Sequence, residues 1–423
     1  MKSISMIDKK TSSLLKQHWV DNFARNSLLA LLKNIELGHL TIEDQGEIFS
    51  FGEAKEKATL IAHISVNHAS FYRHVLFGGS IGAGEAYMFK IWWSPDLVQV
   101  IRVMALNMKV LQQLDSKWSS IFNFICRIAH KLRPNTINKA RENIAAHYDL
   151  GNNFFSLFLD KTMLYSAAIY PHENASLEQA SLHKMAHICK RLQLNENDHL
   201  LEIGTGWGGM AIYAAQQTGC RVTSVTISQE QYSYAKAWVK REGLEHKVNI
   251  LLQDYRLIEG KFDKLLSIEM IEAVGHEFYR EYFSKCSGLL KTNGLMLIQA
   301  ITIQDQRFEY AQANTDFIQQ YIFPGGCLPS NAIIAKHINE DTDMQIIGLE
   351  DITIDYAKTL EHWRSAFFAN VEKVKTQGFD EVFIHMWDFY LCYCEGSFRE
   401  RAISTAQFLF AKPAARTMPN FYE

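Results

Sequence analysis

The sequence predicts an α/β protein, with a mostly parallel sheet covered by helices on both faces and a small mixed α+β domain before it. Beyond residue 195, runs typical of buried strands alternate with helical patterns, which is the arrangement of a parallel sheet. Before that point, short β-rich runs lie between two helical stretches. The 423 residues are enough for two or three domains, each able to bury a core of its own.

The first domain is expected over residues 1–116. Helical periodicity and β-rich runs alternate along it, with helices predicted at 11–38 and 96–132 and strands at 47–52 and 58–66. A glycine-rich run follows at 78–87. It lacks the Lys-Ser/Thr ending of a phosphate-binding P-loop, so we predict a structural loop there.

A linker with basic and apolar residues is predicted at 117–143. Six cations surround the apolar run 121–125, namely Lys117, Arg127, Lys131, Arg133, Lys139 and Arg141. Basic and apolar residues on one helical segment are typical of contact with a membrane surface. A solvated linker helix is the alternative.

The second domain is expected over residues 144–423. Buried strands are predicted at 200–203, 221–226, 248–252, 262–268, 294–300 and 406–411. Helical patterns separate them, for example at 228–242 and 277–290. We therefore expect a parallel sheet whose carboxyl-terminal edge carries the functional residues.

Composition and charge exclude several classes of protein. The chain has 43 Lys and Arg against 46 Asp and Glu, and 48% of its residues are hydrophobic. This balance excludes wholesale disorder and argues against a dedicated nucleic-acid binder. The seven cysteines contain no C-x-x-C pair, so neither disulfides nor a metal site is expected. Without an apolar signal core or a long apolar run, we expect a cytoplasmic protein whose membrane contact is peripheral.

The most informative motif follows the first strand of the second domain. Its residues include Glu202, Gly204, Gly206, Gly208 and Gly209. Glycines between a strand and a helix allow a tight turn and close approach of a ligand. The acid two residues before the first glycine suits an ammonium group better than a pyrophosphate. The E-x-G-x-G pattern therefore favours S-adenosylmethionine (AdoMet), as in class I methyltransferases, over a dinucleotide or a purely structural turn.

Polar residues at the ends of the next two strands are the other candidates for cofactor binding. The second strand ends with hydroxyls and amides at Thr226, Ser228 and Gln231, where methyltransferases usually place a ribose-binding acid. After the third strand, Asp254 and Tyr255 stand where a polar side chain commonly meets the adenine amino group. A surface turn is the alternative for the latter pair.

At this point the sequence resembles the cyclopropane fatty acid synthase family. The resemblance rests on long motifs at 147–160, 163–166, 201–209, 267–275, 317–330 and 389–399. It implies a class I (Rossmann-like) methyltransferase domain with a mostly parallel, seven-stranded sheet and a helical lipid-binding insertion at about 303–346. It also implies an N-terminal domain that contacts lipid, and cofactor contacts from Tyr165 and Ser166.

The family also implies a reaction. The methyl group of AdoMet is transferred to the double bond of an unsaturated fatty acyl chain in a membrane phospholipid. A carbocation results, a bound bicarbonate ion removes a proton from the new methyl group, and a cyclopropane ring closes. Aromatic faces can stabilise the cation, and the candidates are Tyr321, Phe323, Phe367, Phe368, Phe389 and Tyr390. The implied partners are acyl chains and the anionic inner face of the cytoplasmic membrane, and a homodimer remains open.

The bicarbonate pocket of the family maps onto this chain with two departures. The carboxylate matches Glu272, the tyrosine Tyr356 and the backbone contact Ile301. Gln299 replaces the usual histidine, and Ala167 replaces a cysteine whose main-chain amide makes the contact. Glutamine offers an amide donor but cannot carry a proton.

Three further points stay open in the sequence. Cys394 matches a cysteine that is often assigned to the active site, and we expect it to line the pocket. Glu269 would face the same side as Glu272 if that segment were helical. Because Gln299 weakens the base, a methyl- or methylene-branched product is the alternative to a ring, and a lapsed lipid-binding relative is the alternative to an enzyme.

Overall fold

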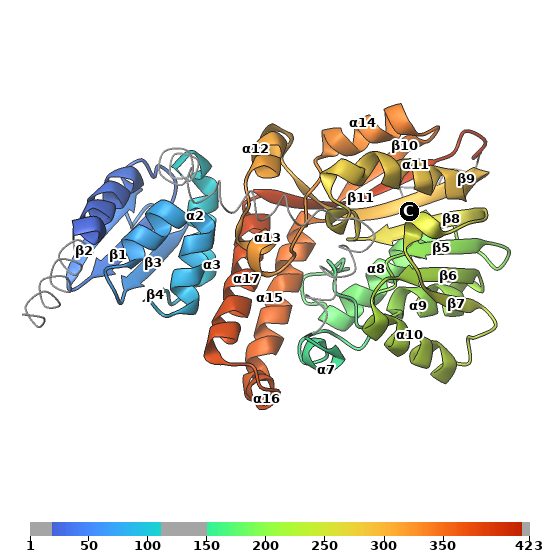
Figure 1. The fold of residues 1–423 in the computed structure, drawn as a ribbon, viewed down its shortest axis with the longest axis horizontal. Coiled ribbons are helices and arrows are strands. Elements are labelled where there is room, and N and C mark those ends of the chain that lie inside the picture. Colours follow the sequence, from blue (N-terminus) through green and yellow to red (C-terminus); the bar gives the residue numbers. More distant parts are fainter. Residues whose placement is uncertain (1–18, 111–149, 417–423) are drawn as a thin grey trace, which may run out of the picture. The chain divides into compact units, whose positions relative to one another are not determined.

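The structure, a computed structural model, describes residues 19–110 and 150–416 (Figure 1). The described chain divides into two compact units. The first holds the residues up to 110, Thr315–Gln320 and Gly378–Glu400, and the second holds the remainder. The predicted linker at 117–143 lies outside the described residues.

The first unit contains a four-stranded sheet in the order β2-β1-β3-β4. Its strands are β1 (His39–Asp44), β2 (Glu47–Gly52), β3 (Ile61–Val66) and β4 (Trp92–Trp93). The strand β1 pairs antiparallel with β2 and parallel with β3. The strands predicted at 47–52 and 58–66 are thus confirmed. The first described helix ends at residue 32, so the predicted helix is too long and β1 was missed.

The helices of this unit include residues 19–32, α2 (Phe71–Met88), α3 (Leu97–Leu106) and α17 (Glu381–Arg399). The glycine-rich run lies inside α2, so the prediction of a loop there is wrong. The helix is kinked at Gly79, whose φ is 53°. A Cβ at Gly82 would lie 1.9 Å from the His74 carbonyl oxygen, and one at Gly84 would lie 2.3 Å from the Phe317 ring. The glycines therefore allow close packing around a kinked helix.

The second unit contains a seven-stranded sheet in the order β10-β11-β9-β8-β5-β6-β7. The strands are β5 (His199–Ile203), β6 (Arg221–Thr226), β7 (Val248–Leu252), β8 (Phe262–Ile268), β9 (Leu290–Ile303), β10 (Gln345–Asp351) and β11 (Ile403–Ala411). β11 is antiparallel to both of its neighbours, and the other pairs are parallel. The six predicted strands are confirmed, and β10 was missed.

Helices surround this sheet in Figure 1. They are α7 (Asn152–Phe155), α8 (Leu177–Arg191), α9 (Gly209–Thr218), α10 (Gln229–Arg241), α11 (Tyr279–Leu289), α12 (Phe308–Ala313), α14 (Asn331–Asp341), α15 (Thr353–Ala369) and α16 (Val371–Thr376). The short α13 (Phe317–Tyr321) begins in the first unit. Short 3₁₀ helices lie at Tyr255–Leu257 (η1), Ile271–Ala273 (η2), His276–Phe278 (η3) and Asp305–Arg307 (η4).

Two cores lie on opposite faces of the sheet, because alternate residues of a strand point to opposite sides. On β5, Leu201 and Ile203 join the core formed with α11 and α14. Leu200 instead joins the core formed with α8, α9 and α10. The same alternation puts Glu202, Gln299 and Gln407 on the α8 face. The predicted sheet covered on both faces is therefore confirmed.

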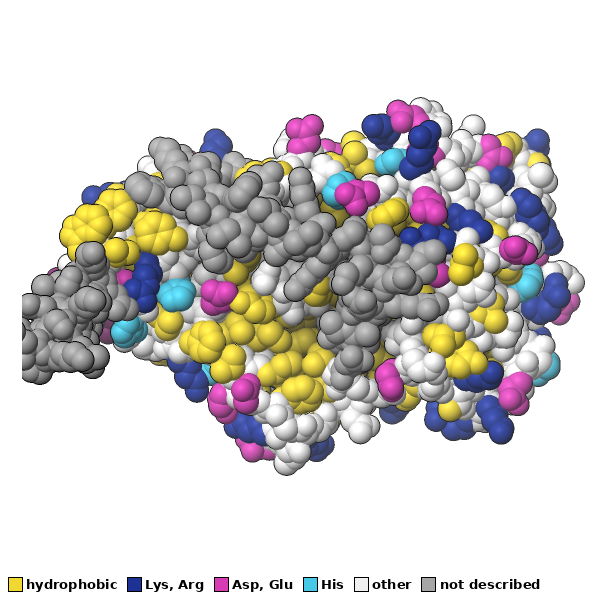
Figure 2. All heavy atoms as spheres, in the orientation of Figure 1, with side chains coloured by type: hydrophobic (Ala, Val, Ile, Leu, Met, Phe, Trp, Pro, Cys, Tyr) yellow, Lys and Arg dark blue, Asp and Glu magenta, His cyan; other side chains and the backbone are white. Residues whose placement is uncertain are grey.

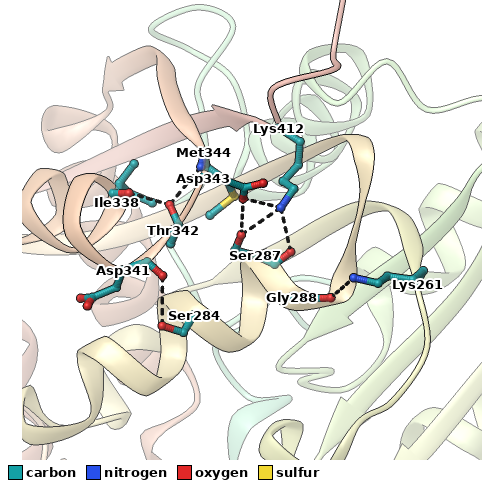
Figure 3. Close-up of polar contacts among 10 residues, drawn as sticks. All are labelled: Lys261, Ser284, Ser287, Gly288, Ile338, Asp341, Thr342, Asp343, Met344 and Lys412. Carbon is teal, nitrogen blue, oxygen red and sulfur yellow. Dashed lines mark hydrogen bonds and ion pairs between the residues drawn. The ribbon is translucent and has the colours of Figure 1, made fainter.

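The C-terminal end of β11 is anchored by a half-exposed ion pair at the edge of the second unit (Figure 3). The ammonium group of Lys412 is paired with Asp343 and donates to the Ser287 hydroxyl at 3.1 Å. The Ser287 hydroxyl also donates to Asp343 at 2.8 Å. These contacts tie α11, β11 and the chain leading into β10 together, and they lie apart from the carboxyl ends of the parallel strands.

Figure 2 shows basic and acidic side chains interspersed over the second unit. Within the described ranges, no helix combines the length and hydropathy needed to span a membrane. The same ranges contain no cluster of three or more His, Cys, Asp or Glu side chains arranged to hold a metal ion.

Candidate active site

The glycine loop after β5 leaves open space at one position and packs tightly at two others. Gly204, Gly206 and Gly208 all have positive φ, at 101°, 53° and 94°. A Cβ at Gly206 would meet nothing within 4 Å. A Cβ at Gly208 would lie 2.9 Å from Ala235 on α10, and one at Gly209 would lie 2.2 Å from the carbonyl oxygen of Thr162. Gly206 therefore borders the space for a ligand, whereas Gly208 and Gly209 let the loop pack.

Glu202 is buried beneath this loop. It is 2% exposed, and its carboxylate accepts a 2.5 Å hydrogen bond from the Ser224 hydroxyl on β6. The Thr205 hydroxyl lies 2.7 Å from the same Ser224 oxygen. Burial raises the pKa of Glu202 to about 8, and the bond from Ser224 acts in the opposite direction. A carboxyl with this pKa ionises readily when a cationic ligand binds near it.

The polar residues at the end of β6 form one buried group. The Thr226 hydroxyl donates to the side-chain oxygen of Gln231 at 2.9 Å. Ser228 caps α10, with its side chain accepting from the amide of Gln231 at 3.3 Å. The residues predicted to contact the ribose therefore lie together at the carboxyl end of β6, next to the glycine loop.

Asp254 is also buried, but it has a strong partner. Both of its carboxylate oxygens are held by the Arg256 guanidinium, at 2.9 and 2.7 Å. Burial raises the pKa of the neighbouring Tyr255 above its ordinary value, and its ring packs edge-on against Tyr282 at 5.6 Å. Asp254 therefore has a structural role at this turn. Its contact with adenine stays a prediction.

Aromatic rings lie beside the glycine loop. The Trp207 ring lies 4.9 Å from that of Phe155, which lies 5.2 Å from Tyr165. Tyr165 in turn lies 5.0 Å from Trp363 on α15. The open position at Gly206, the buried acid and these rings fit AdoMet, whose sulfonium favours aromatic faces.

Glu269, which directly follows β8, is the second carboxylate of this region. Glu269 Oε1 accepts hydrogen bonds from the Ala167 amide and from the Gln299 side chain, both at 2.8 Å. Glu269 Oε2 accepts from the Tyr356 hydroxyl at 2.8 Å. Three of the groups predicted to bind bicarbonate therefore bind Glu269. Glu269 follows β8 directly and is not helical, so the predicted helical relation to Glu272 is not present.

Glu272 and Ile301, the other two residues predicted to bind bicarbonate, contact each other. Glu272 Oε1 accepts a 2.5 Å hydrogen bond from the Ile301 amide. Glu272 Oε2 is buried and has no hydrogen-bond partner within the described residues. Burial and the nearby charge of Glu269 raise the pKa of Glu272 to about 8.

A buried chain of amides fixes the direction of Gln299. Arg191 can only donate, and it donates to the side-chain oxygen of Gln407 at 3.2 Å. The Gln407 amide nitrogen then donates to the Gln299 oxygen at 3.0 Å. The Gln299 nitrogen consequently points at the Ala167 carbonyl, at 3.1 Å, and at Glu269.

A fully buried lysine lies on the other side of the cluster. Lys184 on α8 is 0% exposed and donates to the Ser166 hydroxyl at 2.7 Å. Burial lowers the pKa of Lys184 to about 8, and the charges of Glu269 and Asp160 oppose that shift. Burial likewise raises the pKa of Glu269, opposed first by Lys184 and then by its three donors. Lys184 is thus the cation that compensates Glu269.

This geometry does not fit a separate bicarbonate ion. The Ala167 amide, Gln299 and Tyr356 already hold the Glu269 carboxylate, and the Ile301 amide already holds Glu272. A second anion there would also face two acidic side chains. We therefore derive no step through bicarbonate.

Cys394 lies on α17 of the first unit, and its predicted place in the pocket stays a prediction. Burial raises the pKa of its thiol, which disfavours the thiolate. Two of the aromatic candidates, Phe389 and Tyr390, also lie on α17. Phe367 packs 6.4 Å from Phe158 within the second unit.

Comparisons with known proteins show which family the chain belongs to. The family model of mycolic acid cyclopropane synthetase matches residues 135–408. The chain belongs to this family. It is 37% identical over 347 residues to the tuberculostearic acid methyltransferase of Mycobacterium tuberculosis, covering 78% of each chain. It is also 37% identical over 354 residues to the cyclopropane-fatty-acyl-phospholipid synthase of Escherichia coli, covering 83% of this chain and 88% of the relative.

A solved structure of a mycolic acid cyclopropane synthase, complexed with SAH and CTAB, is similar as well. Its TM-score is 0.60 at 29% identity, over 64% of this chain and 98% of that one. The cyclopropane synthase family member described here is therefore an AdoMet-dependent methyltransferase of the cyclopropane-fatty-acyl-phospholipid synthase type. Its seven-stranded sheet is that of a class I methyltransferase.

Sequence reasoning underrated two residues of the site. Glu269 was considered only through its spacing from Glu272, and Lys184 was not considered. The signal for Glu269 was an acid directly after a buried strand, at the edge where ligands bind. Nothing in the sequence marks Lys184 as buried, because a lysine in an amphipathic helix is usually exposed.

Proposed function

We propose that this enzyme transfers a methyl group from AdoMet to the double bond of an unsaturated acyl chain in a membrane phospholipid, and that the product is a cyclopropane. The observation that supports this most strongly is the position of the carboxylate cluster. A Cβ at Gly204 would lie 3.4 Å from the side chain of Met270, so the glycine loop adjoins the segment that carries Glu269 and Glu272. Cofactor and proton acceptor therefore share one edge of the sheet.

AdoMet, when bound, supplies an electrophilic methyl group. We assign Glu202 to its ammonium group, and Thr226, Ser228 and Gln231 to its ribose. The ring of Trp363 lies 5.0 Å from Tyr165 and 6.1 Å from Tyr356. These rings would exclude water from the site, which helps because an alkene is a weak nucleophile. Their π faces would stabilise the cation that forms on the acyl chain.

The lipid assignment also draws on the named relatives and on the first unit. That unit exposes Trp19, Ile48, Phe89 and Trp93, with exposed fractions from 47% to 70%, and Figure 2 shows hydrophobic side chains at its surface. We propose that the N-terminal domain, at about 1–116, contacts lipid together with the linker 117–143. The insertion at about 303–346 would admit the acyl chain. Peripheral binding to the inner face of the cytoplasmic membrane and a homodimer remain predictions.

Methyl transfer can be tested with AdoMet labelled in its methyl group and vesicles of a monounsaturated phosphatidylglycerol. Lipid mass spectrometry should show labelled acyl chains that have gained one CH₂. Calorimetry should show AdoMet binding in the same preparation. AdoMet binding without any labelled lipid would instead support a lapsed, lipid-binding relative.

A methyl- or methylene-branched product is the second candidate. It is favoured by Gln299 in place of the usual histidine and by the similarity to a tuberculostearic acid methyltransferase. A cyclopropane and a methylene branch have equal mass, so the two need a spectroscopic distinction.

A further inference from the structure

We propose that Glu269 is the catalytic base of this enzyme and takes the place of an external carbonate-type anion. The inference rests on the proposed transfer of a methyl group to an alkene. It assigns a covalently attached carboxylate to the position where the resemblance implied a bound ion.

Glu269 occupies three of the donors that the resemblance assigns to the bound anion. The Ala167 amide, the Gln299 side chain and the Tyr356 hydroxyl come from three distant segments, and each donates to Glu269 at 2.8 Å. A planar carboxylate has the same pair of oxygens as a bicarbonate ion. Three convergent donors stabilise that anion in a buried place.

The groups around Glu269 are donors and a cation, which suit an anion. The amide chain from Arg191 through Gln407 forces the donor end of Gln299 toward Glu269. The buried ammonium of Lys184 supplies the opposite charge. An apolar group at position 269 would leave these donors and this cation without their acceptor.

The backbone of Glu269 is strained. Glu269 has a φ of 47°, in the left-handed region that residues other than Gly, Asn and Asp rarely adopt. Its amide donates to the Gln299 carbonyl at 2.7 Å, which holds the strained turn in place. Strain of this kind is kept where a side chain must point in one direction. Here it directs the carboxylate into the donors rather than along the strand.

The step assigned to Glu269 is a single proton transfer. Once the acyl chain carries the new methyl group and a positive charge, one C–H bond of that methyl group breaks. The proton goes to a carboxylate oxygen of Glu269. The electron pair of the C–H bond forms the third bond of the ring and neutralises the carbocation. The proton leaves Glu269 for water after the products depart.

The test compares Glu269→Gln and Glu269→Gly with Glu245→Gln, an exposed-turn control. All four proteins, including the wild type, are assayed for label transfer in buffer stripped of CO₂ and again with added bicarbonate or formate. Loss of a general base commonly costs about 10²–10⁴-fold in rate. The wild type and Glu245→Gln should be equally active with and without bicarbonate. Glu269→Gln should lose at least about a hundredfold in kcat at unchanged AdoMet affinity.

Glu269→Gly provides the decisive arm. Glycine accepts the positive φ without strain and leaves a space beside the three donors. This variant should bind ¹³C-bicarbonate in a carbon NMR titration, whereas the wild type should not. Formate or bicarbonate should restore part of its turnover. A wild type that needs bicarbonate for turnover would overturn the proposal, and so would a Glu269→Gln variant of near wild-type rate.

Failure of the proposed function has a different signature. If the wild type transfers no label to any lipid, the lipid reaction is wrong. The bicarbonate titration of Glu269→Gly still tests the anion site in that case, since it requires no turnover. Bicarbonate binding to the wild type would then contradict the assignment of Glu269.

Discussion

At the scale of single residues, four ionisable groups define the site, and the loss of solvent around their charges is the largest influence on their pKa values. Glu202 and Glu272 have pKa values raised to about 8, and the pKa of Lys184 is lowered to about 8. These three groups therefore titrate near neutral pH, where the charge of a bound ligand can change their protonation. Glu269 differs because three donors and a cation oppose the effect of burial.

The raised pKa of Glu202 predicts that AdoMet affinity depends on pH. Without ligand, Glu202 is largely protonated below about pH 8. A nearby ammonium favours its ionised form, so binding releases a proton, and affinity should rise with pH until about 8 and then level off. Calorimetry from pH 6 to 9 can measure this. Glu202→Gln should lose the Glu202 share of the slope, while retaining any part due to AdoMet itself. Parallel slopes would contradict the assignment.

The glycine loop predicts that two neighbouring substitutions fail in different ways. Gly206→Asp places a side chain and a negative charge in the open space, so it should abolish AdoMet binding with little change in Tm. Gly209→Ala drives its Cβ against the Thr162 carbonyl, so it should lower Tm. Calorimetry and thermal unfolding of both variants separate the two roles. Normal AdoMet affinity in a folded Gly206→Asp protein would contradict the cofactor site.

At the scale of elements, hydrophobic periodicity predicted the buried strands correctly. It failed for elements whose packing partners are distant in the sequence or that lie at the edge of the sheet. Most residues of the six predicted strands of the large sheet are buried, as a sheet covered on both faces requires. The missed strand β10 is an edge strand with no fully buried residue, so its residues carry little pattern. The glycine run was wrongly placed in a loop because its reasons are the kink of α2 at Gly79 and the close contact of Gly84 with the distant Phe317 ring.

The glycines of α2 give an element-scale prediction. Gly78 is helical and a Cβ there would meet nothing within 4 Å, so Gly78→Ala should stabilise the protein by about 0.5–1 kcal/mol. Gly82→Ala should destabilise it by more than about 1 kcal/mol, because its Cβ would collide with a backbone carbonyl. Denaturant unfolding of both variants checks this. Equal stabilisation by both would indicate that the run is a loop in solution.

Sequence motifs likewise predicted only part of the candidate site. The glycine loop, Glu272 and Tyr356 were found because motifs carry them in sequence. The role of Glu269 could not be found that way, since its donors lie 102, 30 and 87 residues away. Only the folded sheet edge shows that they converge on one carboxylate.

At the scale of the whole molecule, a net charge of only −3 means that any attraction to an anionic membrane would have to come from a local basic patch. We expect peripheral binding to vesicles that strengthens with anionic lipid, owing to the basic residues at 117–141. Salt should weaken it, because surface charges are screened over about 8–10 Å at ordinary ionic strength. Vesicle sedimentation at low and high salt measures this. Identical binding to neutral and anionic vesicles would exclude the electrostatic part.

We propose that this enzyme methylates an alkene and closes it to a ring with a base that belongs to the chain itself. The sharpest test is proton NMR of phospholipid treated with the wild-type enzyme and AdoMet in buffer free of bicarbonate. We expect the upfield signals of cyclopropane ring protons. Signals of a methylene or methyl branch in their place, or a product that forms only when bicarbonate is added, would contradict it.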